Sequence, residues 1–209
     1  MSASAPLDPA AQARLKALER ARPKDLEEAL ADPSFAVRSR AVELAAQHIP
    51  PERLVALVAS GDNFARRASA INALGRAGPR AIPTLLKAIE SGEAGARIFC
   101  LQALGRIRAP EALEALCKAS TSEDTLIAQA AIEALGVQGD PRAIPYLVDA
   151  LGKDHWRGMA AIVALGRIRD PRVPEALRAH REEPRYRELI DDILARLENT
   201  LRPRSTEVA

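Results

Sequence analysis

Aromatic side chains and cysteines are scarce in this chain of 209 residues. Phe, Trp and Tyr make up 3% of it, and there are two cysteines, Cys100 and Cys117. With so few rings, alanine and leucine must build the interior, which suits helices that approach one another closely. The cysteines have neither CxxC spacing nor a nearby histidine, so neither a disulfide framework nor a zinc site is expected.

Excess charge and long apolar runs are also lacking. The formal net charge is +2, too small to indicate a nucleic-acid or membrane partner. No stretch approaches the roughly 20 apolar residues that span a bilayer. Residues 1–6 contain neither the basic nor the apolar region of a signal peptide. We therefore expect a cytoplasmic protein with no membrane partner.

Recognisable catalytic chemistry is missing as well. The three histidines, His48, His155 and His180, lie far apart and have no partners at the spacing of a metal site or a catalytic triad. The glycines occur singly, so no phosphate-binding loop is present. We expect no catalytic residues, no metal and no cofactor.

A short phrase, Ala-Leu-Gly, recurs about every 30 residues, at 73–75, 103–105, 134–136 and 164–166. A decayed copy, Leu44-Ala45-Ala46, precedes the first. A fixed period of this length is typical of stacked helical repeats. Cys100 stands where other repeats have alanine, so we expect it to be a small buried residue.

Each repeat is predicted to hold two helices, because small and aliphatic residues recur three and four apart. The longer second helices are expected at 34–48, 63–76, 94–106, 125–137 and 155–168. Shorter first helices are expected at 24–31, 52–60, 80–91, 111–120, 142–152 and 172–181, the last two with Asp-Pro at the start.

The two ends differ from the middle. Residues 8–22 are predicted to form a cap helix that begins at Asp8 and Pro9, and residues 184–199 a charged helix with one apolar line. Such helices prevent end-to-end growth, so we expect a monomer. The predicted organisation is a single repeat domain over 8–200, with repeats over 24–182 and disordered tails at 1–7 and 201–209.

Three segments carry a family resemblance: residues 30–38, 140–151 and 164–177. They resemble the HEAT repeats, and most closely the phycobilisome-lyase-type HEAT-like subclass. The resemblance covers residues 24–182. It implies an all-α solenoid, a right-handed superhelix of about five two-helix repeats with terminal capping helices, in which the second helices line the concave face.

The resemblance also implies a structural ladder, in which an acidic residue in the turn and an Arg early in the second helix bond between repeats. The matching pairs are Asp32 with Arg38, Asp62 with Arg67, and Glu93 with Arg97. Ala128 and Gly158 replace the Arg in the last two repeats, where Arg157 is a partial substitute.

Helical spacing then selects the residues that face a partner. Arg76, Arg106 and Arg167 recur at one position and form a basic edge; alternatively, they only favour the negative end of the helix dipole. Trp156 is a candidate contact; alternatively, it fills the gap under the turn within a repeat, as Phe35 and Phe64 would. The predicted binding residues are Arg40, Glu43, Asn72, Arg76, Phe99, Gln102, Arg106, Glu133, Val163, Arg167 and Trp156.

The function expected from this pattern is a non-catalytic adaptor that binds another protein, as an acidic peptide or an amphipathic helix, along the concave face. The subclass name alone suggests an alternative, a bilin lyase subunit. A second alternative is a nucleic-acid-binding helical-repeat protein, similar to the alkylation-repair proteins. Those rely on a basic groove with several aromatic residues, which this chain lacks, so nucleic acid is not the expected partner.

Overall fold

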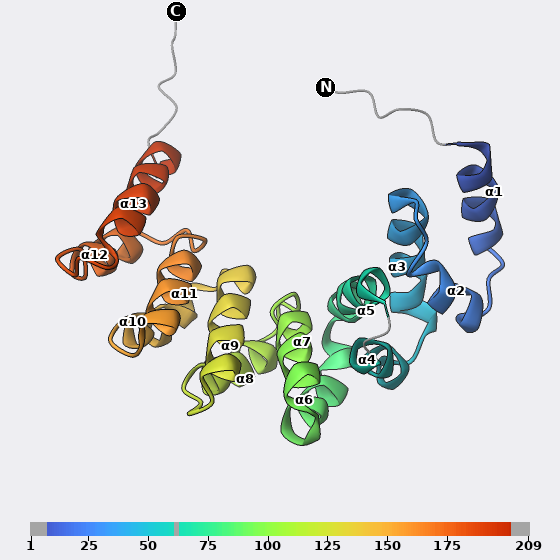
Figure 1. Cartoon of the computed structure of the whole chain (residues 1–209), viewed down its shortest axis with the longest axis horizontal. Coiled ribbons are helices and arrows are strands. Elements are labelled where there is room, and N and C mark those ends of the chain that lie inside the picture. Colours follow the sequence, from blue (N-terminus) through green and yellow to red (C-terminus); the bar gives the residue numbers. More distant parts are fainter. Residues whose placement is uncertain (1–7, 61–62, 202–209) are drawn as a thin grey trace, which may run out of the picture. The chain divides into compact units, whose positions relative to one another are not determined.

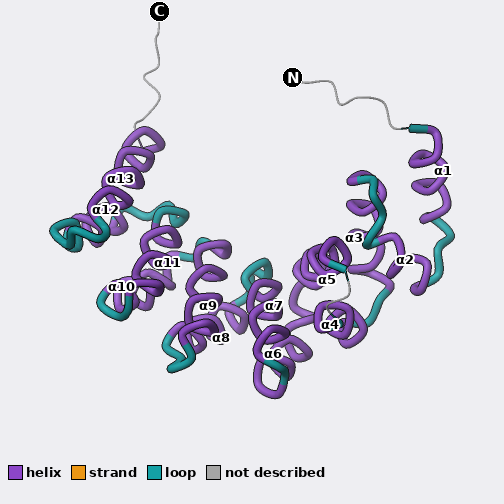
Figure 2. Tube along the Cα trace, viewed as in Figure 1, coloured by secondary structure: helices purple, strands orange, loops and turns teal. Residues whose placement is uncertain are grey.

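The structure of the chain is a computed structural model, and it describes residues 8–60 and 63–201. These residues form α-helices and two short 3-10 helices, with no strand among them (Figures 1 and 2). The chain divides into two compact units, Met1–Ala112 and Leu113–Ala209, which are described separately.

The first unit contains seven α-helices among its described residues, and α8 begins at its end. Their bounds are α1 (Pro9–Leu18), α2 (Pro23–Ala29), α3 (Phe35–His48), α4 (Pro51–Ala59), α5 (Phe64–Ala77), the 3-10 helix η1 (Gly78–Ala81), α6 (Ile82–Ser91), α7 (Ala94–Leu104) and α8 (Pro110–Ser120). Here α3 packs against α1, α2 and α5, while α4 and α7 pack against α5.

The second unit continues the same alternation of short and long helices. Its elements after α8 are α9 (Thr125–Gln138), η2 (Pro141–Ala143), α10 (Ile144–Leu151), α11 (His155–Leu165), α12 (Arg172–Arg178) and α13 (Arg187–Leu201). α11 packs against α9, α10 and α13, and α12 packs against α13.

The helices follow the predicted order, and the expectation of an all-α solenoid of two-helix repeats is confirmed. Several ends differ by two to four residues: α7, α11 and α12 end earlier than expected, α13 begins later, and α1 stops at Leu18 rather than at residue 22. Arg22 has extended dihedral angles because it precedes Pro23, which disfavours a helical conformation for the residue before it. The expected tails lie outside the described residues, except that Leu201 is the last residue of α13.

Side-chain caps fix where several helices begin. Asp8 accepts hydrogen bonds from the main-chain N–H groups of Ala10 (2.6 Å) and Ala11 (3.1 Å). Asn63, Asp124 and Asp154 cap α5, α9 and α11 in the same way. These contacts satisfy N–H groups that have no partner within the helix.

The buried stripes of the second helices are where helical spacing places them. Ala70, Ile71 and Leu74 are buried in α5, and so are their counterparts in α11. Cys100 is fully buried in α7, as expected, and its burial raises the pKa of its thiol to about 11.

The glycine of Ala-Leu-Gly is a point of close approach between repeats. A Cβ on Gly75 would lie 2.6 Å from Cβ of Arg106, and one on Gly136 would lie 2.7 Å from Cα of Ala164. In both cases the glycine faces the following repeat: Gly136 faces its second helix, α11, and Gly75 faces a residue shortly after its second helix, α7.

The predicted ladder pairs the carboxylate of Asp32 with Arg38, but in the structure this carboxylate has other partners. The Asp32 carboxylate accepts hydrogen bonds from Nε of Arg14 (2.8 Å) and from the main-chain N–H of Ser34 (2.8 Å). Arg38 instead donates to the main-chain oxygens of Asp32 (2.5 Å) and Pro33 (2.9 Å). The carboxylate is thus occupied by the cap helix and by its own turn. Asp62 lies outside the described residues.

The other ladder arginines also avoid carboxylates. Nε of Arg97 donates to the main-chain oxygen of Ile89 (2.9 Å), and the Arg67 guanidinium lies over the ring of Phe99, 4.7 Å from its centroid. These arginines bind main-chain oxygen or an aromatic face.

In the last repeat a different residue fills the space of the missing arginine. A Cβ on Gly158 would overlap the hydroxyl of Tyr186, which is fully buried. Arg157 lies beside this position and donates to the main-chain oxygen of Glu123 and to Oγ1 of Thr125, both at 3.2 Å. Arg157 therefore links its repeat to the preceding one.

Candidate peptide-binding groove

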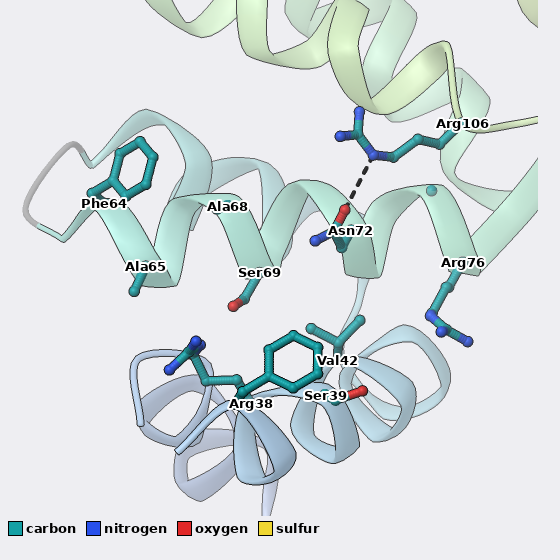
Figure 3. Close-up of a pocket in the computed structure, with 12 residues that line it drawn as sticks. Arg38, Ser39, Val42, Phe64, Ala65, Ala68, Ser69, Asn72, Arg76 and Arg106 are labelled. Carbon is teal, nitrogen blue, oxygen red and sulfur yellow. Dashed lines mark hydrogen bonds between the residues drawn. The ribbon is translucent and has the colours of Figure 1, made fainter. Parts of the chain in front are cut away.

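A groove of about 720 Å³ lies between α3 and α5 in the first unit (Figure 3). Residues at helical spacing share one face of each helix, which is why positions 35, 39 and 42 of α3 meet positions 64, 68, 72 and 75 of α5. The lining residues are Phe35, Arg38, Ser39, Val42, Phe64, Ala65, Ala68, Ser69, Asn72, Gly75, Arg76 and Arg106.

Two phenylalanines line the groove, one from α3 and one from α5. Phe35 and Phe64 are the first residues of α3 and α5, and they are 77% and 83% exposed. We considered that Phe35, Phe64 and Trp156 fill a gap under a turn, and that alternative is wrong because Trp156 is also 64% exposed. Exposed rings at the start of a helix have few intramolecular contacts to lose when a partner binds.

The basic end of the groove contains Arg76 and Arg106. Arg76 lies in the last turn of α5, is exposed and has no hydrogen-bond or ion-pair partner among the described residues. Nε of Arg106 donates to Oδ1 of Asn72 (3.1 Å), and another of its nitrogens donates to the main-chain oxygen of Gln102 (2.6 Å). Partial burial lowers the pKa of Arg106, which remains cationic. Arg106 therefore serves the C-terminal end of α7 as well as the groove.

Polar side chains lie between the two ends. Ser39 and Ser69 form no side-chain hydrogen bond with any described residue, and Figure 3 shows the Ser69 hydroxyl pointing from α5 toward α3. Asn72 uses its oxygen to accept from Arg106. None of the twelve lining residues is acidic, so the groove is positively charged.

Two predicted residues lie beside the groove rather than in it. Arg40 forms ion pairs with Glu19 (2.8 Å) and Glu43 (3.0 Å). Glu43 lines a second hollow of about 600 Å³ together with Arg76 and Arg80. The pairing of Arg40 and Glu43 leaves little net charge at this point.

Phe99, a predicted binding residue, does not line the groove. It is half-buried on α7, beneath the Arg67 guanidinium. Gln102, one turn later, contributes its main-chain oxygen to Arg106. The structure therefore gives Phe99 a role in packing α7 against α5.

The remaining predicted residues lie in the second unit, on α9 and α11. Glu133 accepts from Nε2 of Gln129 (3.0 Å), and Arg167 is exposed without a polar partner among the described residues. Trp156 and Val163 are exposed on α11, alongside Leu126 and Val137 on α9. Leu126 was missed, although it follows the Asp124 cap as Trp156 follows Asp154.

Residues 8–60 and 63–201 contain neither a metal-binding cluster nor a membrane-spanning helix. No group of three or more His, Cys, Asp and Glu side chains there could hold a metal ion. No helix in these ranges is both long and apolar enough to cross a membrane.

The helix pairs and their period define a class of protein, the helical-repeat proteins. The family model for HEAT repeats matches residues 51–125, 82–159 and 120–197, which together cover most of the chain. The chain belongs to the HEAT-repeat family, as the sequence resemblance indicated. A search of the curated proteins finds no significant match.

Two solved structures show the likeness in fold. The complex of CpcE and CpcF of phycocyanin lyase from Nostoc sp. PCC7120 matches with a TM-score of 0.58 and 22% identity, over 71% of this chain and 97% of that one. Human deoxyhypusine hydroxylase in complex with glycerol matches with a TM-score of 0.52 and 23% identity, over 92% of this chain and 81% of that one. The first likeness agrees with the resemblance to lyase-type HEAT-like repeats, and both concern fold alone.

Proposed function

We propose that this chain is a non-catalytic interaction module, which binds a segment of another protein in the groove between α3 and α5. The observation that carries the proposal is a groove with two exposed rings, three arginines and no acidic lining residue. Its positive charge is not balanced by any group that lines it, so an acidic segment would supply the missing partner.

Binding in this groove is favourable for two physical reasons. An exposed phenylalanine buries apolar surface when an apolar side chain packs against it, at roughly 25 cal/mol per Å². The guanidinium groups of Arg76 and Arg106 can each bind a carboxylate through two N–H groups. Aromatic and arginine residues are the usual anchors of protein interfaces.

The test begins with capture of partners from native lysate on the purified chain, followed by titration of the purified partner. Phe64→Ala and Arg76→Glu change exposed groove residues without opening a core. We expect each to weaken binding at least tenfold while the melting temperature changes little.

A matched control is Arg169→Glu. Arg169 is exposed in the second unit and, like Arg76, has no polar partner among the described residues. Both substitutions change the net charge by the same amount. Binding of the partner by this control should equal that of the parent. Equal partner affinity for the parent, Phe64→Ala and Arg76→Glu would overturn the proposed function.

A further inference from the structure

The groove has a direction, because its apolar and basic groups lie at opposite ends of α5. Phe64 begins the helix and Arg76 lies in its last turn, and Figure 3 shows them at the two ends of the lined face. We propose that the occupant is an extended peptide with a large apolar side chain at the Phe64 end and aspartate or glutamate at the Arg76 and Arg106 end. This inference rests on the proposed function and specifies the ligand of the same groove.

The length of α5 sets the spacing within the peptide. Phe64 and Arg76 are 12 residues apart (76 − 64), which at 1.5 Å per residue corresponds to about 18 Å along the helix. An extended chain covers about 3.3–3.6 Å per residue. The apolar anchor and the acidic residues are therefore expected about five residues apart.

The polar middle of the groove favours an extended peptide over a helix. The main-chain N–H and C=O groups of an extended peptide need partners, whereas a helix satisfies its own. The hydroxyl of Ser39, which is half-buried, binds no described residue, and the amide nitrogen of Asn72, which is exposed, likewise has no partner among the described residues. An amphipathic helix would instead need a continuous apolar floor.

The arginines at the two ends of the groove have different roles, and this decides at which end the acidic residues of the peptide bind. Arg38 is held by the main-chain oxygens of Asp32 and Pro33, and it lies 6.0 Å from the ring centroid of Phe35. Arg38 thus already has partners within the chain. Arg76 has no such contact, so the end that contains it is the one available to carboxylates.

The experiment uses three fluorescein-labelled peptides of equal composition, each with one Phe and one Asp-Asp pair. The Phe and the pair are separated by two, five or ten residues, with serine and glycine elsewhere, and binding to the full chain is measured by anisotropy. We expect the five-residue peptide to bind at least fivefold more tightly than the other two. Phe64→Ala should weaken binding of the five-residue peptide, but should not change the affinity of a peptide in which Phe is replaced by Gly.

Three results would overturn the inference. They are equal affinity at all spacings, no binding by any peptide at millimolar concentration, and tighter binding by a helix-forming peptide with its Phe and Asp pair 12 residues apart. If one of these occurs while Arg76→Glu still weakens the captured partner, the extended-peptide inference fails and the proposed function stands. If partner binding is also unchanged in the variants, both fail.

Discussion

Replacing Gly136 with alanine tests whether the repeats touch at the glycine of Ala-Leu-Gly. The added Cβ would lie 2.7 Å from Cα and 2.8 Å from Cβ of Ala164 on α11. Neither atom can rotate away, because one belongs to the helix main chain and the other is attached directly to it. α9 and α11 must therefore move apart by several tenths of an ångström or more.

The size of the effect follows from two opposing contributions. Overpacking of a well-packed interface costs about 1–3 kcal/mol, and we expect about 2–3 kcal/mol here because neither of the two contacted atoms of Ala164 can move aside. Alanine in place of glycine within a helix gains about 1 kcal/mol. We expect Gly136→Ala to lower the free energy of unfolding by about 1–2 kcal/mol, which at 2–4 °C per kcal/mol lowers the melting temperature by about 2–8 °C.

The control is Gly95→Ala, at a helical position of α7 where an added Cβ meets nothing within 4 Å. It should leave stability unchanged or raise it by up to about 1 kcal/mol. Urea unfolding followed by circular dichroism measures both variants. If Gly136→Ala proves as stable as the parent, then glycine at this position is not required for the close contact between α9 and α11.

Three further substitutions have expected outcomes. Leu104→Ala should cost about 2–5 kcal/mol in urea unfolding, because Leu104 is fully buried in α7, and a loss below about 1 kcal/mol would mean that its neighbours close the cavity. Tyr186→Phe should raise stability by about 1 kcal/mol, because the buried hydroxyl has no hydrogen-bond partner, and a destabilised variant would show that the hydroxyl is bonded. Hydrogen bonds from the Arg172 side chain and main chain lower the pKa of Asp170 to about 2, so its stabilising contribution is complete above about pH 4 and is lost as the pH falls toward 2. Thermal melts of Asp170→Asn should therefore depend less on pH than those of the parent in this window, and parallel curves would contradict the assignment.

The helices could be predicted closely because their signals are local. Caps such as Asp124 and Asp154, prolines at helix starts and apolar residues three and four apart all act within one helix. The neighbour of each glycine could not be predicted. Helical spacing shows that Gly75 and Gly136 share a face with other small residues, but not which helix lies opposite.

The groove was predicted in part. Asn72, Arg76 and Arg106 were selected by helical spacing, and Phe35 and Phe64 obey the same rule, since they precede Ser39 and Ala68 by four residues. They were compared with Trp156 as residues that fill the gap under a turn, because they stand near the corresponding positions of their repeats.

Pairs formed between different helices could not be predicted from spacing. Arg67 covers Phe99, and Arg14 binds Asp32 from the cap helix. Both contacts depend on how the helices stack rather than on positions within one helix.

Two arginines, Arg80 and Arg157, join successive repeats through main-chain oxygens. Arg80 donates to the oxygens of Ala46 (2.7 Å) and Ile49 (3.1 Å) at the end of α3, and Arg157 reaches the oxygen of Glu123. Every residue carries such an oxygen, so this attachment tolerates sequence drift in the neighbouring repeat. Mutations can then accumulate on the outward faces, and new ligands can evolve, while the joints between repeats stay intact.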